Sequence, residues 1–263
     1  MAQIVESKKM RFVITHNAFH GAWLWDRFKP LLEAEGHEVS VFDLAASGSD
    51  PRDIEEISSA DAYTQPLLDV LGKVPEGEKV ILVGHSFGGI NAAIAMDKYP
   101  EKVAVVVFLN AFVPDTKNKP SYVLDEYMGI FDDFKDCVVS NYTCGNKTLT
   151  KMLLGPNFLR QNLFNTSPDE DVQRAIKKTR WASFFCEDLA VREKFTEEGY
   201  GSVPRVSIIC KEDKGIPAEY QRWMAANFGI EKVFEIDGAD HSPMCSSPSE
   251  LLNKFLDIAQ SNM

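Results

Sequence analysis

The segment 79–98 constrains the fold more than any other part of the chain. Its apolar run Val80-Ile81-Leu82-Val83 is followed by Gly84-His85-Ser86-Phe87-Gly88 and then by a helical pattern up to residue 98. The spacing Gly-x-Ser-x-Gly is typical of a sharp turn from a buried strand into a helix, where glycines two positions from the serine permit close approach. This pattern predicts that Ser86 projects above the strand as a nucleophile, beside helix N–H groups that favour negative charge. The alternative is a serine that only closes a turn.

Short apolar runs alternate with helical patterns along most of the chain, which is typical of βα units. The runs are continuously apolar, as expected for strands that helices cover on both faces. We therefore predict an α/β fold with a mostly parallel sheet flanked by helices. The predicted strands cover residues 11–15, 38–44, 79–83, 103–110, 206–210 and 232–236. The predicted helices cover residues 25–35, 61–74, 87–98, 218–228 and 248–260.

Residues 113–203 interrupt this alternation with Asn/Thr/Gly-rich turns and clusters of aromatic residues. Because so long a structureless loop is uncommon in a compact domain, we predict a mainly helical cap inserted into the core formed by 1–112 and 204–263. In the functional interpretation this cap is a lid that shapes a pocket. In the other interpretation it only enlarges the core.

A serine at its ordinary pKa is a weak nucleophile and needs a base that a third group orients. In enzymes with this strand–turn–helix motif the acid follows the serine along the chain, and the histidine comes last. His241 is the only histidine after Ser86, and it follows the last predicted strand. Asp213 and Glu212 both follow the preceding strand, with Asp213 modestly favoured. Asp240 is a poor candidate because it adjoins His241.

An oxyanion hole needs two backbone donors. The N–H of Phe87, directly after the proposed nucleophile, supplies one of them. The second donor is expected from the loop after the first central strand, His16-Asn17-Ala18-Phe19-His20-Gly21-Ala22-Trp23. Loss of one such donor typically raises the reaction barrier by about 3 kcal/mol.

Composition excludes several other classes of function. The 263 residues carry 28 basic and 39 acidic side chains, a formal net charge of −11, which disfavours nucleic acid and anionic lipid as partners. The longest apolar stretch, residues 103–109, is too short to cross a bilayer, and the first ten residues resemble no secretory signal. Five cysteines form no CxxC pair, which favours a reduced, cytoplasmic setting. We therefore take the Asn-x-Ser/Thr sequons as chance occurrences.

With these motifs together, the chain resembles the plant methylesterase and hydroxynitrile lyase family of α/β hydrolases over nearly its whole length. The resemblance implies an α/β-hydrolase fold with a helical cap, a small-molecule substrate, no metal or cofactor, and a homodimer as one oligomeric state. It also implies that the acid is Asp213 and that the oxyanion donors are Ala18 and Phe87. It rests on His20-Gly21-Ala22-Trp23, Leu44-Ala45-Ala46-Ser47-Gly48, Gly84-His85-Ser86-Phe87-Gly88-Gly89, Pro120-Ser121-Tyr122, Glu198-Gly199-Tyr200-Gly201-Ser202-Val203, Glu212-Asp213-Lys214 and Asp240-His241.

A few positions separate the activities of this family. Its esterases usually carry Gly where this chain has Asn17, and its S-selective lyases carry Thr there and Lys where this chain has Ser242. Asn17 with Ala18, and Asn110-Ala111-Phe112, are similar to the R-selective lyases, whereas His85 is the esterase residue. The resemblance is therefore mixed.

We predict first a serine hydrolase that cleaves a methyl ester of a small plant metabolite through an acyl-enzyme, with decarboxylation of the product as a further step. The alternative is an R-selective lyase that splits cyanohydrins into aldehyde and cyanide with the same three residues and Asn17. A non-catalytic receptor for a small ligand is the third hypothesis. The expected substrate contacts are Asn17, Phe19, His20, His85, Phe112, Ser242 and aromatic residues of the cap.

Overall fold

The computed structural model describes residues 9–131 and 134–262. Its centre is a six-stranded sheet in the order β2-β1-β3-β4-β7-β8, in which every neighbouring pair is parallel. The two central strands β3 and β4 consist largely of buried valine, isoleucine and leucine. The strands are β1 (Arg11–Thr15), β2 (Glu38–Val41), β3 (Val80–His85), β4 (Val103–Leu109), β7 (Arg205–Cys210) and β8 (Lys232–Ile236).

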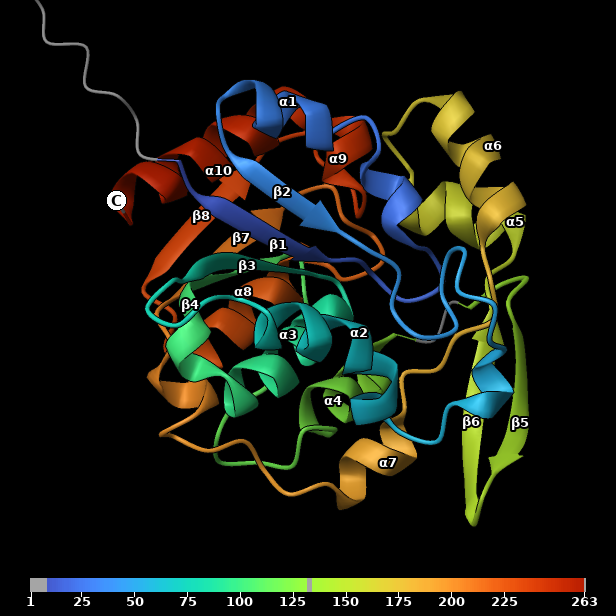
Figure 1. The fold of residues 1–263 in the computed structure, drawn as a ribbon. Coiled ribbons are helices and arrows are strands. Elements are labelled where there is room, and N and C mark those ends of the chain that lie inside the picture. Colours follow the sequence, from blue (N-terminus) through green and yellow to red (C-terminus); the bar gives the residue numbers. More distant parts are fainter. Residues whose placement is uncertain (1–8, 132–133, 263) are drawn as a thin grey trace, which may run out of the picture.

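Helices cover both faces of this sheet (Figure 1). On one face lie α1 (Lys29–Ala34) and α10 (Pro248–Ser261), and on the other α2 (Ala60–Gly72), α3 (Gly88–Lys98) and α8 (Ala218–Asn227). Parallel strands need such crossover helices to bury both faces. The predicted α/β fold with a mostly parallel sheet is confirmed.

Two details of the predicted core are wrong. The predicted helix over 25–35 is divided into a 3₁₀ turn (Ala22–Trp25) and α1, because Pro30 lacks a donor N–H and fits only the first turn of a helix. The strands are also not all covered on both faces. In the edge strand β8 only Ile236 is buried, and the side chain of Val233 is 39% exposed. An apolar run alone does not tell an edge strand from a central one.

The segment between β4 and β7 contains more helical than strand residues, but the prediction of a mainly helical cap did not include its strands. It contains an antiparallel hairpin, β5 (Val138–Cys144) and β6 (Lys147–Leu153), which stands at the side of the molecule (Figure 1). The two-residue loop Gly145-Asn146, with a positive φ at Gly145, is a hairpin signal that the helical prediction overlooked. The helices here are α4 (Tyr122–Ile130), α5 (Pro156–Phe158), α6 (Asp169–Lys178) and α7 (Cys186–Val191).

The remaining helical elements are short connections. They are Ile54–Glu56, Pro100–Lys102, Tyr200–Ser202, the π-helical turn Leu159–Leu163 and α9 (Pro243–Ser246). Across residues 9–131 and 134–262, no helix combines the length and apolar character needed to traverse a bilayer. Residues 1–8, on which the prediction of no secretory signal depends, lie outside the described residues.

Candidate active site

The residues predicted to act together all follow the carboxyl ends of sheet strands. Ser86 comes directly after β3, Asp213 after β7 and His241 after β8, while the loop 16–23 follows β1. The carboxyl ends of parallel strands meet at one edge of the sheet, where ligands bind in open α/β folds. The topology therefore brings distant parts of the chain to one place.

Ser86 occupies a strained turn at the start of α3. Its φ of 57° lies in the left-handed region, which a non-glycine residue adopts at a cost. The turn is held by hydrogen bonds from Ser86 N to Leu109 O (3.2 Å) and from Gly89 N to Ser86 O (3.0 Å). A Cβ atom at Gly84 would lie 2.7 Å from the backbone oxygen of Gly88. The first and last residues of the motif are thus glycines because strand and helix touch there.

His241 and Asp213 form a buried pair, with 2.8 Å between Nδ1 of the imidazole and Oδ2 of the carboxylate. Because the carboxylate accepts the Nδ1 proton, Nε2 of a neutral His241 carries the lone pair that a general base needs. Oδ1 of Asp213 accepts backbone N–H groups from Gly215 and Ile216, each at 2.8 Å. The carboxylate is therefore fixed in position and well provided with donors.

Ser86 and His241 line the same pocket, but within the described residues no hydrogen bond joins the Ser86 hydroxyl to the imidazole. Contacts of this kind are often long or poorly aligned in a ligand-free enzyme and tighten in the substrate complex. The arrangement leaves His241 Nε2 and Ser86 Oγ on one cavity, with the pair Asp213–His241 already formed.

Two backbone donors beside Ser86 are unused. In the part of the chain that the structure describes, neither the N–H of Ala18 nor that of Phe87 donates to another protein group. Ala18 lines the pocket, and Phe87 caps α3 immediately after Ser86. Free N–H groups at these places are what an oxyanion hole requires.

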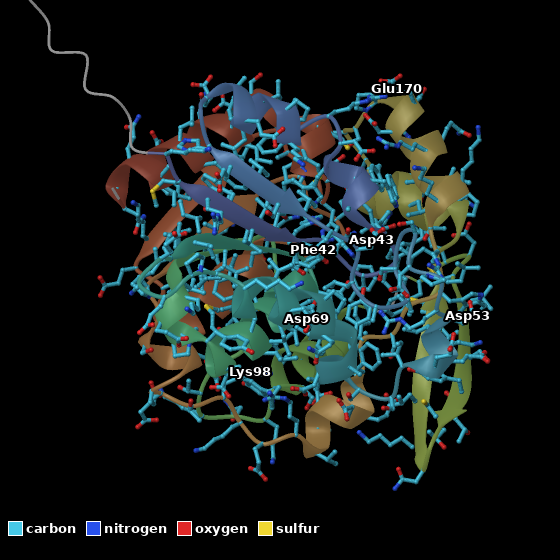
Figure 2. All side chains as sticks on the ribbon, in the orientation of Figure 1. Phe42, Asp43, Asp53, Asp69, Lys98 and Glu170 are labelled. Atoms are coloured by element: carbon cyan, nitrogen blue, oxygen red, sulfur yellow. The ribbon has the colours of Figure 1, made fainter. Side chains whose placement is uncertain are left out.

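Buried polar side chains hold the loop that carries Ala18. His16 donates from Nδ1 to the carbonyl of Asn17 (2.7 Å) and accepts at Nε2 from the N–H of Leu44 (3.0 Å). Burial lowers the pKa of His16, which keeps the ring neutral for these two roles. Asp43, labelled in Figure 2, accepts the N–H of Ala22 at 2.7 Å. The position of the free N–H is therefore set by contacts outside the pocket.

The pocket has a cavity volume of about 30 Å³. Its polar groups are few, and no lysine or arginine from the described residues lines it. The structure brings Asn17, Phe19 and Phe112 to this surface, as predicted, together with Ser86 and His241. The other lining residues are mostly apolar: Ala18, Tyr127, Phe134, Met152, Leu154, Phe158, Leu163, Phe184, Gly215 and Ile216.

Three predicted substrate contacts, His20, His85 and Ser242, are not on this lining, which corrects the prediction. All three are buried. His85 lies behind His241: it donates from Nε2 to the backbone oxygen of His241 (2.7 Å), and burial holds its pKa well below the usual range. Its ring centroid is 5.2 Å from that of His241. His85 therefore supports the ring of His241 from behind.

His20 and Ser242 are buried and do not line the pocket. His20 packs against the rings of Trp23 and Phe164. The backbone N–H of Ser242 donates to Oδ1 of Asp240 (2.9 Å), so this residue follows the turn that Asp240 stabilises. Ser242 adjoins His241 in the chain, but only His241 lines the cavity.

Sequence reasoning missed two side chains that contact Asp213. Asn110 donates from Nδ2 to Asp213 Oδ2 and to the backbone oxygen of His241, each at 2.9 Å. Gln221 donates to the same carboxylate oxygen at 3.1 Å. Asn110 directly follows the central strand β4, at the edge of the sheet where the other polar residues of the site lie. Its position in the sequence could therefore have predicted that it contacts the site. Gln221 lies inside α8, and nothing in its sequence position predicted a contact with Asp213.

A comparison with known families accords with this geometry. The family model described as "Alpha/beta hydrolase family" matches residues 18–254. The chain belongs to the alpha/beta hydrolase family. The crystal structure of polyneuridine aldehyde esterase superimposes with a TM-score of 0.93 at 40% identity, covering 96% of this chain and 100% of that one.

Among curated proteins, the chain is 49% identical to an alpha-hydroxynitrile lyase of Arabidopsis thaliana, over 97% of this chain and 99% of that protein. It is 47% identical to methylesterase 1 of the same plant, over 97% of each. These relatives confirm the predicted resemblance and bear out the predicted enzyme class, a serine hydrolase of the alpha/beta hydrolase family. Both of the activities weighed from the sequence are named among them.

Proposed function

We propose that this alpha/beta hydrolase cleaves a carboxylic ester, in particular the methyl ester of a small plant metabolite, with Ser86, His241 and Asp213 as its catalytic triad. The observation that carries the proposal is the buried 2.8 Å pair of His241 and Asp213, which leaves the imidazole Nε2 on the cavity that Ser86 also lines. The free N–H groups of Ala18 and Phe87 support it, because ester cleavage develops an oxyanion.

Acylation begins when His241 Nε2 takes the proton of Ser86 Oγ, which attacks the ester carbonyl carbon. The carbonyl oxygen becomes an oxyanion that Ala18 and Phe87 bind through their N–H groups. Asp213 stabilises the imidazolium. His241 then gives its proton to the departing alkoxide, so methanol leaves and the acyl group remains on Ser86.

Deacylation repeats these steps with water. His241 removes a proton from the water as it attacks the acyl carbon, and the Ser86–acyl bond breaks as the ring returns that proton to Oγ. The product is a carboxylic acid. Where that acid carries a β-oxo group or an aldehyde at the same position, loss of carbon dioxide follows without further help from the enzyme.

The lining of the pocket supports a neutral, mainly apolar acyl group. Aromatic rings of Phe112, Tyr127, Phe134, Phe158 and Phe184 surround the cavity, and its polar groups lie at the Ser86 end. A charged group on the substrate would lose its hydration in this pocket and would meet no lysine or arginine among the described lining residues. We infer that residues 113–203 act as the cap over the core formed by 1–112 and 204–263, since several of these rings belong to that segment.

Cyanohydrin cleavage is the second candidate, and a specific observation favours it. Asn17 lines the pocket, and one end of its amide has no hydrogen-bond partner among the residues that the structure describes. In this reaction Ser86 and His241 remove the hydroxyl proton of the cyanohydrin, Asn17 bonds to that oxygen, and the carbon–carbon bond to cyanide breaks. His241 must then protonate cyanide without a neighbouring lysine, since Ser242 follows it.

The test is a paired assay of the purified protein. Neutral methyl esters and aromatic cyanohydrins are supplied separately, and released acid and released aldehyde are quantified. We expect acid release from at least one apolar methyl ester. Aldehyde release without ester turnover would contradict the first proposal and favour the lyase. Binding without turnover of either would favour the receptor, a role that does not require the triad.

We further propose that the enzyme works in the cytoplasm on small molecules and not on nucleic acid or membranes. The five unpaired cysteines and the net charge of −11 support this setting. A homodimer is proposed on the family resemblance alone, and sedimentation of the purified chain tests it.

A further inference from the structure

The amide of Asn17 lies between the pocket and a buried histidine. One of its ends, at the Nδ2 position, is 2.8 Å from His20 Nδ1, and the other end is buried with no hydrogen-bond partner in residues 9–131 and 134–262. Asn17 lines the pocket with Ser86 and His241, whereas His20 does not. Asn17 can present either its oxygen or its NH₂ group to a ligand. Which one it presents depends on whether His20 Nδ1 donates a hydrogen bond to the other end of the amide or accepts one from it.

His20 is a neutral ring. Burial lowers its pKa to about 3, because water cannot solvate a charged imidazole there. A neutral imidazole carries one N–H and one lone pair. Besides Asn17, the carbonyl oxygen of Ala18 lies within reach of Nδ1, at 3.2 Å. A carbonyl only accepts, so this contact is a hydrogen bond only when the proton is on Nδ1.

A proton on Nδ1 fixes the amide of Asn17 as well. The atom 2.8 Å away must then accept, so it is the amide oxygen, and the NH₂ group occupies the unpartnered end. The opposite tautomer would set the Nδ1 lone pair against the Ala18 oxygen. It would also leave an N–H at Nε2, which has no partner among the described residues, beside the rings of Trp23 and Phe164. With the proton on Nδ1, the group left beside these rings is only a lone pair, and the unpartnered N–H groups are those of Asn17, which lines the pocket.

We propose that His20 is a positioning residue that turns the Asn17 amide so that its NH₂ group donates into the pocket. Asn17 thereby becomes a third donor beside the N–H groups of Ala18 and Phe87. The ligand group that fits is an oxygen that carries or develops negative charge next to Ser86. The inference rests on the proposed function for its chemistry, but the orientation of the amide does not depend on which reaction occurs.

The tautomer of His20 is the direct test. Long-range proton–nitrogen correlation spectra of enzyme labelled with ¹⁵N-histidine distinguish a protonated Nδ1 from a protonated Nε2, and a His20→Phe sample identifies the signals of His20. We expect Nδ1–H. A spectrum with the proton on Nε2 overturns the proposal, whether or not the enzyme hydrolyses esters.

Kinetics supply the second test, with p-nitrophenyl acetate as the probe. A donor to a developing oxyanion acts on the transition state, so His20→Phe should lower kcat about tenfold and change KM less than twofold. Asn17→Leu, which lacks the amide, should give a similar loss. The double variant should be no more than twofold slower than Asn17→Leu, because His20 acts through Asn17.

Equal tenfold losses from His20→Phe in both backgrounds would overturn the proposal and make His20 merely structural. His20→Gln, whose side chain also offers an N–H, should recover part of kcat, while a general effect of losing the ring would not be rescued. If no ester is hydrolysed by the wild type, the proposed function fails, but the tautomer measurement still decides the inference.

Discussion

The substitution Asp213→Asn tests the most heavily bonded carboxylate of the site. Oδ1 of Asp213 accepts the N–H groups of Gly215 and Ile216, and Oδ2 accepts donors from Asn110, Gln221 and His241. Asparagine has nearly the same shape but presents two protons on one end. Either orientation of its amide therefore points NH₂ at groups that are already donors.

The cost follows from the two orientations. With NH₂ at the Oδ1 position, two buried backbone N–H groups lose their acceptor. With NH₂ at the Oδ2 position, Asn110 and Gln221 lose theirs, and His241 must accept at Nδ1, which moves its proton to Nε2. At about 1–3 kcal/mol for each buried donor left unpaired, either case lowers the free energy of unfolding by about 2–6 kcal/mol. In the second orientation the base is also lost, and kcat should fall about 10⁴-fold.

Asp240→Asn is a matched control. Asp240 is also buried and also accepts several donors, including the N–H groups of Ser167 and Ser242, but it does not contact the His241 ring. Urea unfolding and kcat for a neutral ester are measured for both variants. We expect both to be destabilised and only Asp213→Asn to lose more than a thousandfold in kcat. A folded Asp213→Asn enzyme within tenfold of the wild-type kcat would refute the role given to Asp213.

Three further outcomes are expected. Ser86→Ala should abolish turnover of esters and cyanohydrins in the paired assay while retaining ligand affinity by calorimetry; residual turnover above one thousandth of wild type would speak against Ser86 as nucleophile. Asn17→Gly should remove any aldehyde release and change ester hydrolysis by no more than about tenfold, so unchanged lyase activity would show that Asn17 has no part in it. Burial lowers the pKa of His20 to about 3 from 6.5. The unfolded chain therefore binds a proton at this residue before the folded protein does, and the free energy of unfolding falls as the pH drops below 6.5, by about 3 kcal/mol at pH 4.5. Urea unfolding of the wild type and His20→Phe at pH 7 and 4.5 should therefore show a smaller pH dependence in the variant, and an equal dependence would contradict the buried neutral ring.

The turn at Ser86 and the meeting of Asp213 with His241 could be predicted because both follow from local sequence patterns. The turn around Ser86 needs glycine where the strand and the helix touch. Ser86, Asp213 and His241 come together because each follows the carboxyl end of a strand in the same parallel sheet. Both rules depend on the local conformation of the backbone, which the residue types at a turn indicate.

Other contacts of the site depend on packing between segments that are distant in the sequence, and no local pattern predicts them. His85 adjoins Ser86 in the chain, yet its ring donates a hydrogen bond to the backbone carbonyl of His241, which is 156 residues away in the sequence. Gln221 reaches Asp213 from inside a helix whose pattern shows only an ordinary amphipathic face. The hairpin β5–β6 was missed for a different reason, because the turn signal at Gly145-Asn146 was not used to divide the segment into strands.

The central claim is that Ser86 becomes covalently acylated through His241 during ester hydrolysis, and mass spectrometry of the quenched enzyme tests it most directly. The wild type is mixed with p-nitrophenyl acetate, stopped with acid within the first turnovers, and digested. The account predicts an acetyl mass increase on the peptide that contains Ser86, and its absence in Ser86→Ala. Ester turnover without that adduct, or with the adduct on another residue, would contradict it.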